Sequence, residues 1–223
     1  MKKNQHILIV LSVIIACICM GIVDAIIEPG YLVKSIIKVL LFLGMPIVYA
    51  LFSKDGNIRK VITPDRKGIL LATVVGFAVY AIVLSAYFIF RNIFDFSALT
   101  TSLTTTTGVN KQNFIWVALY ISFINSFLEE YFFRGFAFLT LKKQTGRMVA
   151  YCFSATMFAF YHVAIMIGWF HYLVVILALI GLFIGGLIFD WLDEKYNNIY
   201  LSWLVHMFAN FATNTIGFIL FKG

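Results

Sequence analysis

The stretch SFLEEYFFRGF, Ser126 to Phe136, places three charged residues, Glu129, Glu130 and Arg134, within a long apolar segment. The rest of the chain is similarly apolar: 62% of its 223 residues are hydrophobic, only 12% are charged, and the mean hydropathy is +0.95. A soluble domain of ordinary composition is about half apolar and about a quarter charged. The composition therefore indicates a membrane protein, and charges within its apolar segments need a physical explanation.

Continuous apolar segments predict transmembrane helices rather than a β-barrel. Most are about 17–25 residues long, as a helix that spans the bilayer requires, and they lack the alternation of barrel strands. The predicted fold class is therefore all-α, a polytopic helical bundle forming one domain over residues 1–223, with about seven spans, or eight on a wider count. The expected spans cover residues 6–27, 33–52, 69–90, 113–141, 149–167, 171–190 and 199–221.

The placement of Lys and Arg predicts the orientation of these spans, because cytoplasmic loops carry an excess of positive charge. The side of the N-terminus holds Lys2, Lys3, Lys54, Arg59, Lys60, Arg66, Lys67, Lys142, Lys143, Arg147 and Lys195. The other side holds Lys34, Lys38, Arg91, Lys111 and Lys222. We therefore expect a cytoplasmic N-terminus and an external C-terminus. The net charge of +7 is then mostly a topology signal, and no nucleic-acid partner is expected.

Two polar segments lie outside the expected spans or at their ends. The Thr-rich segment of residues 97–113 is expected to be external, either as a solvated connection, which is favoured, or as a cap over a cavity. Asp190, Asp193 and Glu194 lie at the end of the sixth expected span and in the loop after it, and they are expected to be solvated.

Charged side chains inside a span are costly and commonly functional. Glu130 and Arg134 are four residues apart, so they lie on one helix face and can form an ion pair. Glu129 lies about 100° around the helix from Glu130 and is expected to remain outside that pair. Glu129 is then either part of a helix–helix clamp or a catalytic or transport carboxylate, and its position inside the membrane favours the functional interpretation.

Two other expected spans carry polar groups at a similar depth. His162 lies in the fifth span, and His206 and Asn210 lie four residues apart on one face of the seventh. Counted from the nearest cytoplasmic charges at about 1.5 Å per residue, Glu129, His162 and His206 lie ~16–23 Å deep, between the midplane and the external side. Three helices are therefore expected to bring Glu129, His162, His206 and Asn210 to one layer.

A carboxylate, two imidazoles and an amide contain the groups needed to hydrolyse an amide bond. A Glu in a poorly hydrated site suits a general base that takes a proton from water, and a His can orient the same water. A His and an Asn on one helix face can donate hydrogen bonds to a developing oxyanion. Two His and a Glu are also a catalytic zinc set, although the HExxH spacing is absent, so no cofactor is predicted and a metal route stays a lesser hypothesis.

The same residues form three short motifs in three separate expected spans: EEYFFR from Glu129, FAFYH ending at His162 and HMFAN from His206. In this order they resemble the EExxxR, FxxxH and HxxxN/B motifs of the CAAX protease and bacteriocin-processing family, also called the Abi family. The resemblance runs from Glu129 to Asn210. It implies an intramembrane glutamate endopeptidase related to the Ras-converting prenyl-protein endopeptidase, with a catalytic core over about residues 113–221.

The resemblance also implies a role for each motif residue. Glu129 would activate water, and His162 would assist it. His206 and Asn210 would form the oxyanion hole. Glu130 and Arg134 would organise the site around these residues.

The substrate and the biological setting are less well determined by the sequence. The small size and the abundance of Ile, Phe, Lys and Asn resemble a small family member from an AT-rich bacterium. This favours a peptide or membrane-protein substrate that enters from the bilayer of a bacterial plasma membrane, in bacteriocin processing or self-immunity. Two other functions stay open: a non-enzymatic immunity or scaffold protein, and, less favoured because no internal repeat is found, a proton-coupled transporter. The oligomeric state is not predicted.

Overall fold

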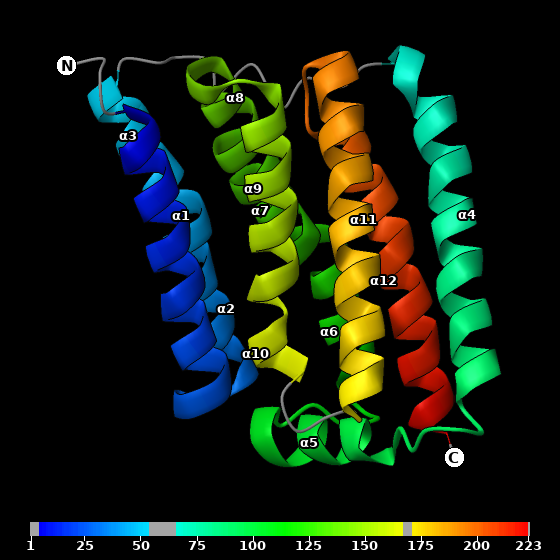
Figure 1. Cartoon of the computed structure of the whole chain (residues 1–223). Helices are drawn as coiled ribbons and strands as arrows, with labels where there is room; N and C mark the ends of the chain where they lie inside the picture. Colours follow the sequence, from blue (N-terminus) through cyan, green and yellow to red (C-terminus); the bar gives the residue numbers. More distant parts are fainter. Residues whose placement is uncertain (1–4, 54–65, 167–170, 223) are drawn as a thin grey trace.

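A computed structural model of the chain describes residues 5–53, 66–166 and 171–222, and every regular element in these ranges is helical. The long helices run side by side in one bundle (Figure 1). In chain order the α-helices and π-helical segments (η) are α1 (Gln5–Ile22), η2 (Val23–Ile27), α2 (Tyr31–Val39), η3 (Leu40–Gly44), α3 (Met45–Ser53), α4 (Arg66–Phe90), α5 (Ser97–Thr107), α6 (Phe114–Tyr120), η5 (Ile121–Asn125), α7 (Ser126–Glu129), η6 (Glu130–Phe138), α8 (Leu139–Thr145), α9 (Arg147–Tyr161), α10 (Val163–Met166), α11 (Tyr172–Tyr196) and α12 (Tyr200–Leu220).

Six helices within the described ranges are long and apolar enough to cross a membrane: Gln5–Ile27, Tyr31–Phe52, Gly68–Phe90, Arg147–Met166, Tyr172–Tyr196 and Tyr200–Leu220. They confirm the predicted polytopic helical bundle, and the chain is a multi-pass membrane protein. Each corresponds to one predicted span. The predicted span at 113–141 is helical from Phe114 to Thr145 but is not among the six. Because this segment carries the three charges of the SFLEEYFFRGF stretch, its crossing of the membrane stays a prediction.

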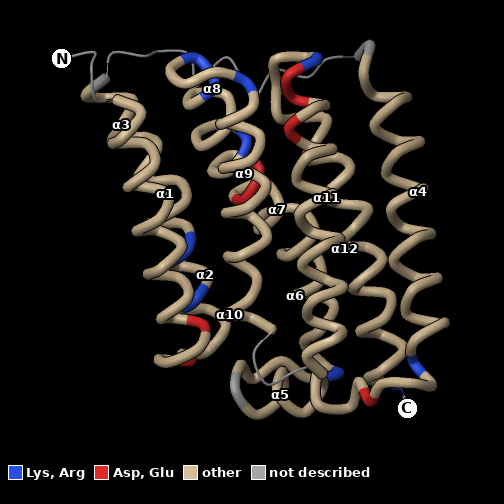
Figure 2. The backbone as a smooth tube through the Cα atoms, viewed as in Figure 1, with Lys and Arg blue, Asp and Glu red and all other residues tan. Residues whose placement is uncertain are grey.

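The two ends of the bundle differ in charge. Figure 1 shows the start of α1 and the end of α12 at opposite ends of the bundle. In Figure 2 the Lys and Arg positions along the backbone gather at the N-terminal end, around α8, the start of α9 and the end of α11. The cytoplasmic location of this end stays a prediction, and its charges at residues 2, 3, 54, 59 and 60 lie outside the described residues.

The Thr-rich segment, favoured from the sequence as a solvated connection, forms a helix. Helix α5 lies across the end of the bundle that is remote from the N-terminus (Figure 1). Before it, Asp95 accepts hydrogen bonds from the backbone nitrogen and hydroxyl of Ser97 at 2.8 and 2.9 Å, which hold the pKa of Asp95 below its usual range. After it, Gly108 adopts a φ of 72°, a left-handed conformation that glycine tolerates.

Glycines allow close packing of α4 on α12. A Cβ atom added at Gly76 would lie 2.4 Å from Cδ2 of Phe208, and one added at Gly68 would lie 2.1 Å from Cδ1 of Leu201. Such small residues let helix backbones approach closely, which is a main source of helix association in membranes. The packing fixes α12, the helix that carries His206 and Asn210, against α4.

Replacing Gly76 by Leu is expected to destabilise the bundle by about 1–3 kcal/mol or more, because the side chain overpacks the α4–α12 contact. The measurement is the thermal unfolding midpoint of purified protein in detergent. Gly181→Leu on α11 is the matched control, because a Cβ atom there lies more than 4 Å from the other residues that the structure describes. Equal midpoints for the two variants would contradict the packing role of Gly76.

Candidate active site

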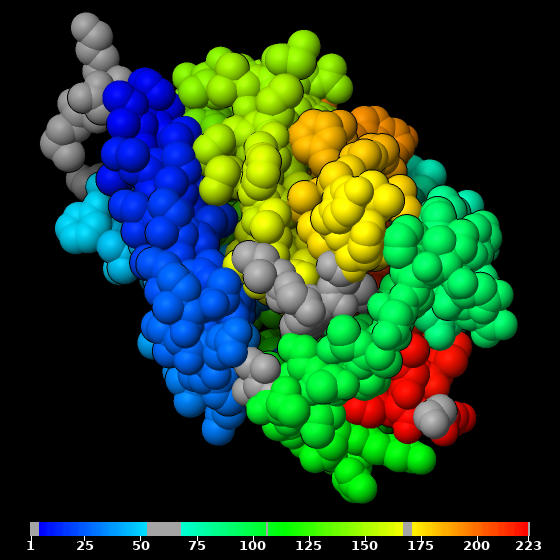
Figure 3. Space-filling view, turned by 60° about the horizontal axis from the view of Figure 1, so that its bottom comes forward, coloured from blue at the N-terminus to red at the C-terminus, as the bar shows by residue number. Residues whose placement is uncertain are grey.

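A cavity of about 1150 Å³ lies inside the bundle, and Glu129, His162, His206 and Asn210 all line it. The structure therefore brings together the four residues that the sequence singled out, from α7, the end of α9 and α12. Figure 3 shows the end of the bundle at which α5 lies, with a hollow between α2 and α5. Leu99 and Leu103 of α5 line the cavity, so this helix covers part of it, as the less favoured prediction of a cap proposed.

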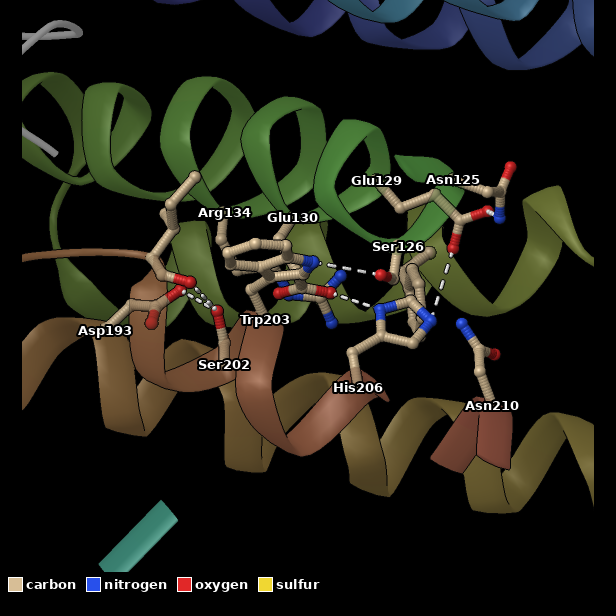
Figure 4. A network of polar contacts seen from close by, with 12 residues as sticks. Asn125, Ser126, Glu129, Glu130, Arg134, Asp193, Ser202, Trp203, His206 and Asn210 are labelled. Carbon is tan, nitrogen blue, oxygen red and sulfur yellow. Dashed lines mark hydrogen bonds and ion pairs between the residues drawn. The ribbon is translucent and has the colours of Figure 1, made fainter. Parts of the chain in front are cut away.

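The two carboxylate oxygens of Glu129 have different surroundings. Oε1 accepts hydrogen bonds from the ammonium of Lys38 and, at 2.9 Å, from the amide of Asn125. Oε2 has no hydrogen-bond partner among the described residues and lies 3.7 Å from Nε2 of His162 and 3.6 Å from Nε2 of His206. Glu129 is only 2% exposed. One oxygen is thus held in place, and the other faces two imidazoles, of which Figure 4 labels that of His206.

The second nitrogen of each imidazole fixes its tautomer. Nδ1 of His162 lies 2.7 Å from the carbonyl oxygen of Phe158, and Nδ1 of His206 lies 2.7 Å from Oε1 of Glu130. Carbonyl and carboxylate oxygens accept hydrogen bonds, so each Nδ1 carries the proton, and Nε2 of a neutral ring is then an acceptor. With both rings neutral, three acceptors, Oε2 of Glu129 and the two Nε2 atoms, therefore meet at one point; protonation of His206 makes its Nε2 a donor instead. Such a point stabilises a group that donates hydrogen bonds or carries positive charge.

Aromatic rings hold both imidazoles. The His206 ring stacks on Phe189, with ring centroids 5.5 Å apart. The His162 ring packs against the rings of Phe158 and Tyr161, with centroids 4.8 and 4.9 Å away. These contacts restrict the rotation of both rings, so their Nε2 atoms remain directed toward Glu129.

Asn210 lies one turn beyond His206 on α12 (Figure 4). Its side-chain amide donates a hydrogen bond to the carbonyl oxygen of Ile121 at 3.0 Å. An amide NH₂ group has two hydrogens, so one remains for a ligand in the cavity. This arrangement agrees with the expectation that His206 and Asn210 share a helix face.

The predicted ion pair between Glu130 and Arg134 is present. Nε of Arg134 lies 3.4 Å from Oε2 of Glu130, and both side chains are fully buried. The guanidinium also lies 3.6 Å from Asp190 and 4.0 Å from the ring centroid of Phe158. Glu130 in turn accepts the Nδ1 proton of His206, so the pair positions this imidazole. The segment that carries the pair, η6, is π-helical, a geometry frequent at functional sites.

Two predictions about charged residues are wrong. Asp190 and Asp193 were expected at a solvated helix end, but both are fully buried. Helix α11 continues to Tyr196, beyond the predicted end at residue 190, and it packs against α9 there, which keeps both carboxylates inside. Ser154 donates a hydrogen bond to Asp190, and Ser202 donates one to Asp193. Glu194, by contrast, is 21% exposed at its side chain and pairs with Arg147 and Lys142.

Sequence reasoning missed Lys38. It counted this residue among the external charges and named no cation as a partner of Glu129, whereas the structure buries Lys38 against Glu129. A signal was available, because Lys38 lies inside the expected span at 33–52. The rule that charges inside a span are commonly functional, applied to Glu129, applies equally to Lys38.

The described residues contain no group of three or more His, Cys, Asp and Glu side chains arranged to hold a metal ion. The acidic and imidazole groups of the site are instead joined to one another and to Lys38 and Arg134. The metal route considered from the sequence stays a hypothesis.

Fold and site together define a polytopic helical membrane protein with a carboxylate–imidazole centre in an internal cavity. Residues 111–212 match the family model of the type II CAAX prenyl endopeptidase, Rce1-like. This match confirms the predicted resemblance of this part of the chain to the CAAX protease family of intramembrane proteases. No curated protein and no solved structure matches the chain. The matched segment contains Glu129, His162, His206 and Asn210.

Replacing Arg134 by Met is expected to lower the stability of the protein by about 3–5 kcal/mol, because it leaves Glu130 and Asp190 as buried charges without their cation. The measurements are the folded yield in membranes and the thermal unfolding midpoint in detergent. Arg147→Met, which removes a 68% exposed side chain from its pair with Glu194, is the control and should change little. A similar effect of both substitutions would contradict the role of the buried pair.

Proposed function

We propose that the protein is an intramembrane endopeptidase in which Glu129 activates a water molecule for attack on a peptide carbonyl. The observation that carries this proposal is the convergence of Oε2 of Glu129 with the Nε2 atoms of His162 and His206, at 3.6–3.7 Å, inside the cavity. A water molecule at this point could donate its two hydrogens to acceptors that are already in place. The family match over residues 111–212 supports the same reaction class.

In the proposed reaction, water lies between Glu129 and His162. Its oxygen attacks the carbonyl carbon of the substrate while Oε2 of Glu129 takes one proton, and Nε2 of His162 orients the other hydrogen. The carbon–nitrogen bond then breaks, and the proton held by Glu129 passes to the leaving amine nitrogen. Atoms and charges balance, because one water is consumed and the products are a carboxylic acid and an amine.

His206 and Asn210 are proposed to stabilise the oxyanion that forms on the carbonyl oxygen. In its protonated form His206 donates from Nε2, and Glu130 stabilises the imidazolium through the 2.7 Å contact at Nδ1. Asn210 contributes its second amide hydrogen. Such preorganised donors in a water-poor site are commonly the largest contribution to catalysis of acyl transfer. Arg134 supports Glu130 and thereby the position of His206.

The proposed substrate is a peptide or membrane protein that reaches the cavity from the bilayer. Aliphatic side chains of α4 and α11 line the cavity and are accessible: Ile82 is 66% exposed and Ile184 is 51% exposed. The cavity thus offers accessible apolar surface, which suits an apolar substrate segment. The proposed setting is bacteriocin processing or self-immunity in a bacterial plasma membrane. The size, the composition and the motif resemblance of the chain support this setting.

Replacing Glu129 by Gln is expected to lower peptide hydrolysis by about 10²–10⁴-fold, because the amide cannot accept the proton of the water. The measurement is cleavage of a fluorogenic peptide library by purified protein in lipid nanodiscs, with and without a chelator. Glu194→Gln, at a partly exposed carboxylate away from the cavity, is the matched control. Full activity of Glu129→Gln would contradict the proposed function.

Replacing Gly185 by Leu is expected to reduce cleavage of peptides with large apolar residues while the unfolding midpoint stays near that of the wild type. Gly185 lines the cavity, and a Cβ atom there meets no described residue within 4 Å, so a larger side chain occupies substrate space without a clash at Cβ. Gly44→Leu is the control, because its Cβ position is equally open but lies outside the cavity lining. Unchanged cleavage in Gly185→Leu would show that substrates do not use this part of the cavity.

A further inference from the structure

We propose that Lys38 is a positioning residue of the active site, which holds Glu129 so that one carboxylate oxygen is fixed and the other faces the reacting groups. This inference rests on the proposed role of Glu129. Lys38 lies outside residues 111–212, so neither the family match nor the three motifs assign it a role. The N-terminal part of the chain thereby contributes a residue to the site.

Lys38 and its partner Asn125 contact one of the two carboxylate oxygens of Glu129. The ammonium donates to Oε1 of Glu129 and to the side-chain oxygen of Asn125. The amide nitrogen of Asn125 also donates a hydrogen bond to the same Oε1, at 2.9 Å, so the three side chains contact one another. With Oε1 occupied twice, Oε2 is the oxygen that faces His162 and His206.

Aromatic contacts fix the position of the ammonium itself. Nζ of Lys38 lies 5.4 Å from the ring centroid of Phe42 and 5.0 Å from that of Tyr161, within the range of cation–π attraction. Phe42 also stacks on Phe132, with centroids 4.3 Å apart. Phe132 lies in η6, the segment that carries Glu130, so the Lys38 side chain and the catalytic segment are packed as one unit.

Charge gives Lys38 a second effect on Glu129. The other polar groups that face Glu129 are Asn125 and the imidazoles of His162 and His206, and Glu130 is its neighbour in sequence. A buried carboxylate without a cation is costly and tends to be neutralised by a proton. A protonated Glu129 could not take a proton from water, so the Lys38 ammonium keeps this carboxylate in the form that the proposed reaction needs.

The test compares Lys38→Gln with Lys38→Arg and with Lys142→Gln, using kcat and KM for peptide hydrolysis in nanodiscs. Lys142 is the matched control: it is a partly buried lysine that pairs with a glutamate, Glu194, at 3.4 Å, but it lies outside the cavity lining. We expect Lys38→Gln to lower kcat by about 10- to 100-fold with little change in KM, because a displacement of a catalytic group by about 1 Å can cost about 10² in rate. Lys38→Arg should recover part of the loss, and Lys142→Gln should leave kcat unchanged.

A stability measurement provides a readout that does not depend on catalysis. We expect Lys38→Gln to lower the unfolding midpoint and the double variant Lys38→Gln/Glu129→Gln to recover it, because the second substitution removes the unpaired carboxylate. If Lys38→Gln fails to accumulate, recovery of folded protein in the double variant supports the inference, and failure of the double variant overturns it.

The outcomes separate this inference from the proposed function. Hydrolysis that survives Glu129→Gln overturns the proposed function, whatever Lys38 does. Loss of hydrolysis in Glu129→Gln together with a wild-type kcat in Lys38→Gln overturns the role of Lys38 alone. A higher KM with an unchanged kcat in Lys38→Gln would also overturn the role of Lys38, since Lys38 would then contribute to substrate binding rather than to the position of the base.

Discussion

The pairing of charges inside an apolar bundle is the constraint on which the rest of this structure depends. An isolated charge in the membrane interior is strongly unfavourable, and here each charged group of the site contacts an opposite charge or a hydrogen-bonding group. Lys38 pairs with Glu129, and Glu130 lies between His206 and Arg134. These pairs join α2, the helical segment that starts at Phe114, and α12. The groups that are costly to bury therefore also fix the positions of the helices around the cavity.

The same pairing gives the two adjacent glutamates, Glu129 and Glu130, different roles. Glu130 accepts the Nδ1 proton of His206 through one oxygen and forms an ion pair with Arg134 through the other, and it is fully buried. Glu129 is held through one oxygen, and its other oxygen faces the cavity with two imidazoles. Two carboxylates that are neighbours in sequence thus point to different surroundings, because successive residues lie on different sides of a helix. The proposed chemistry depends on this difference.

Much of the fold could be predicted because the bilayer imposes it. Apolar segments of membrane length predicted the helices, and six agree with the structure at most ends within a few residues. The largest differences are α5 and the extension of α11 to Tyr196. Both lie where polar residues follow an apolar segment, and there hydropathy does not distinguish a solvated loop from a helix that packs on the bundle. Burial of Asp190 and Asp193 followed from that packing.

By itself, the sequence determined the class of protein, the helical spans and the residues of the C-terminal half that meet in the cavity, because hydrophobic length and i, i+4 spacing are local properties of the chain. Only the tertiary structure decided which groups pair. Lys38 reaches Glu129 across 91 positions of sequence, and no periodicity specifies such a contact. The orientation of the two imidazoles was likewise decided by partners on other segments and by neighbouring rings, Glu130 for His206 and the ring of Phe158 for both. The site is therefore a property of how the helices pack, although most of its residues could be named from the sequence.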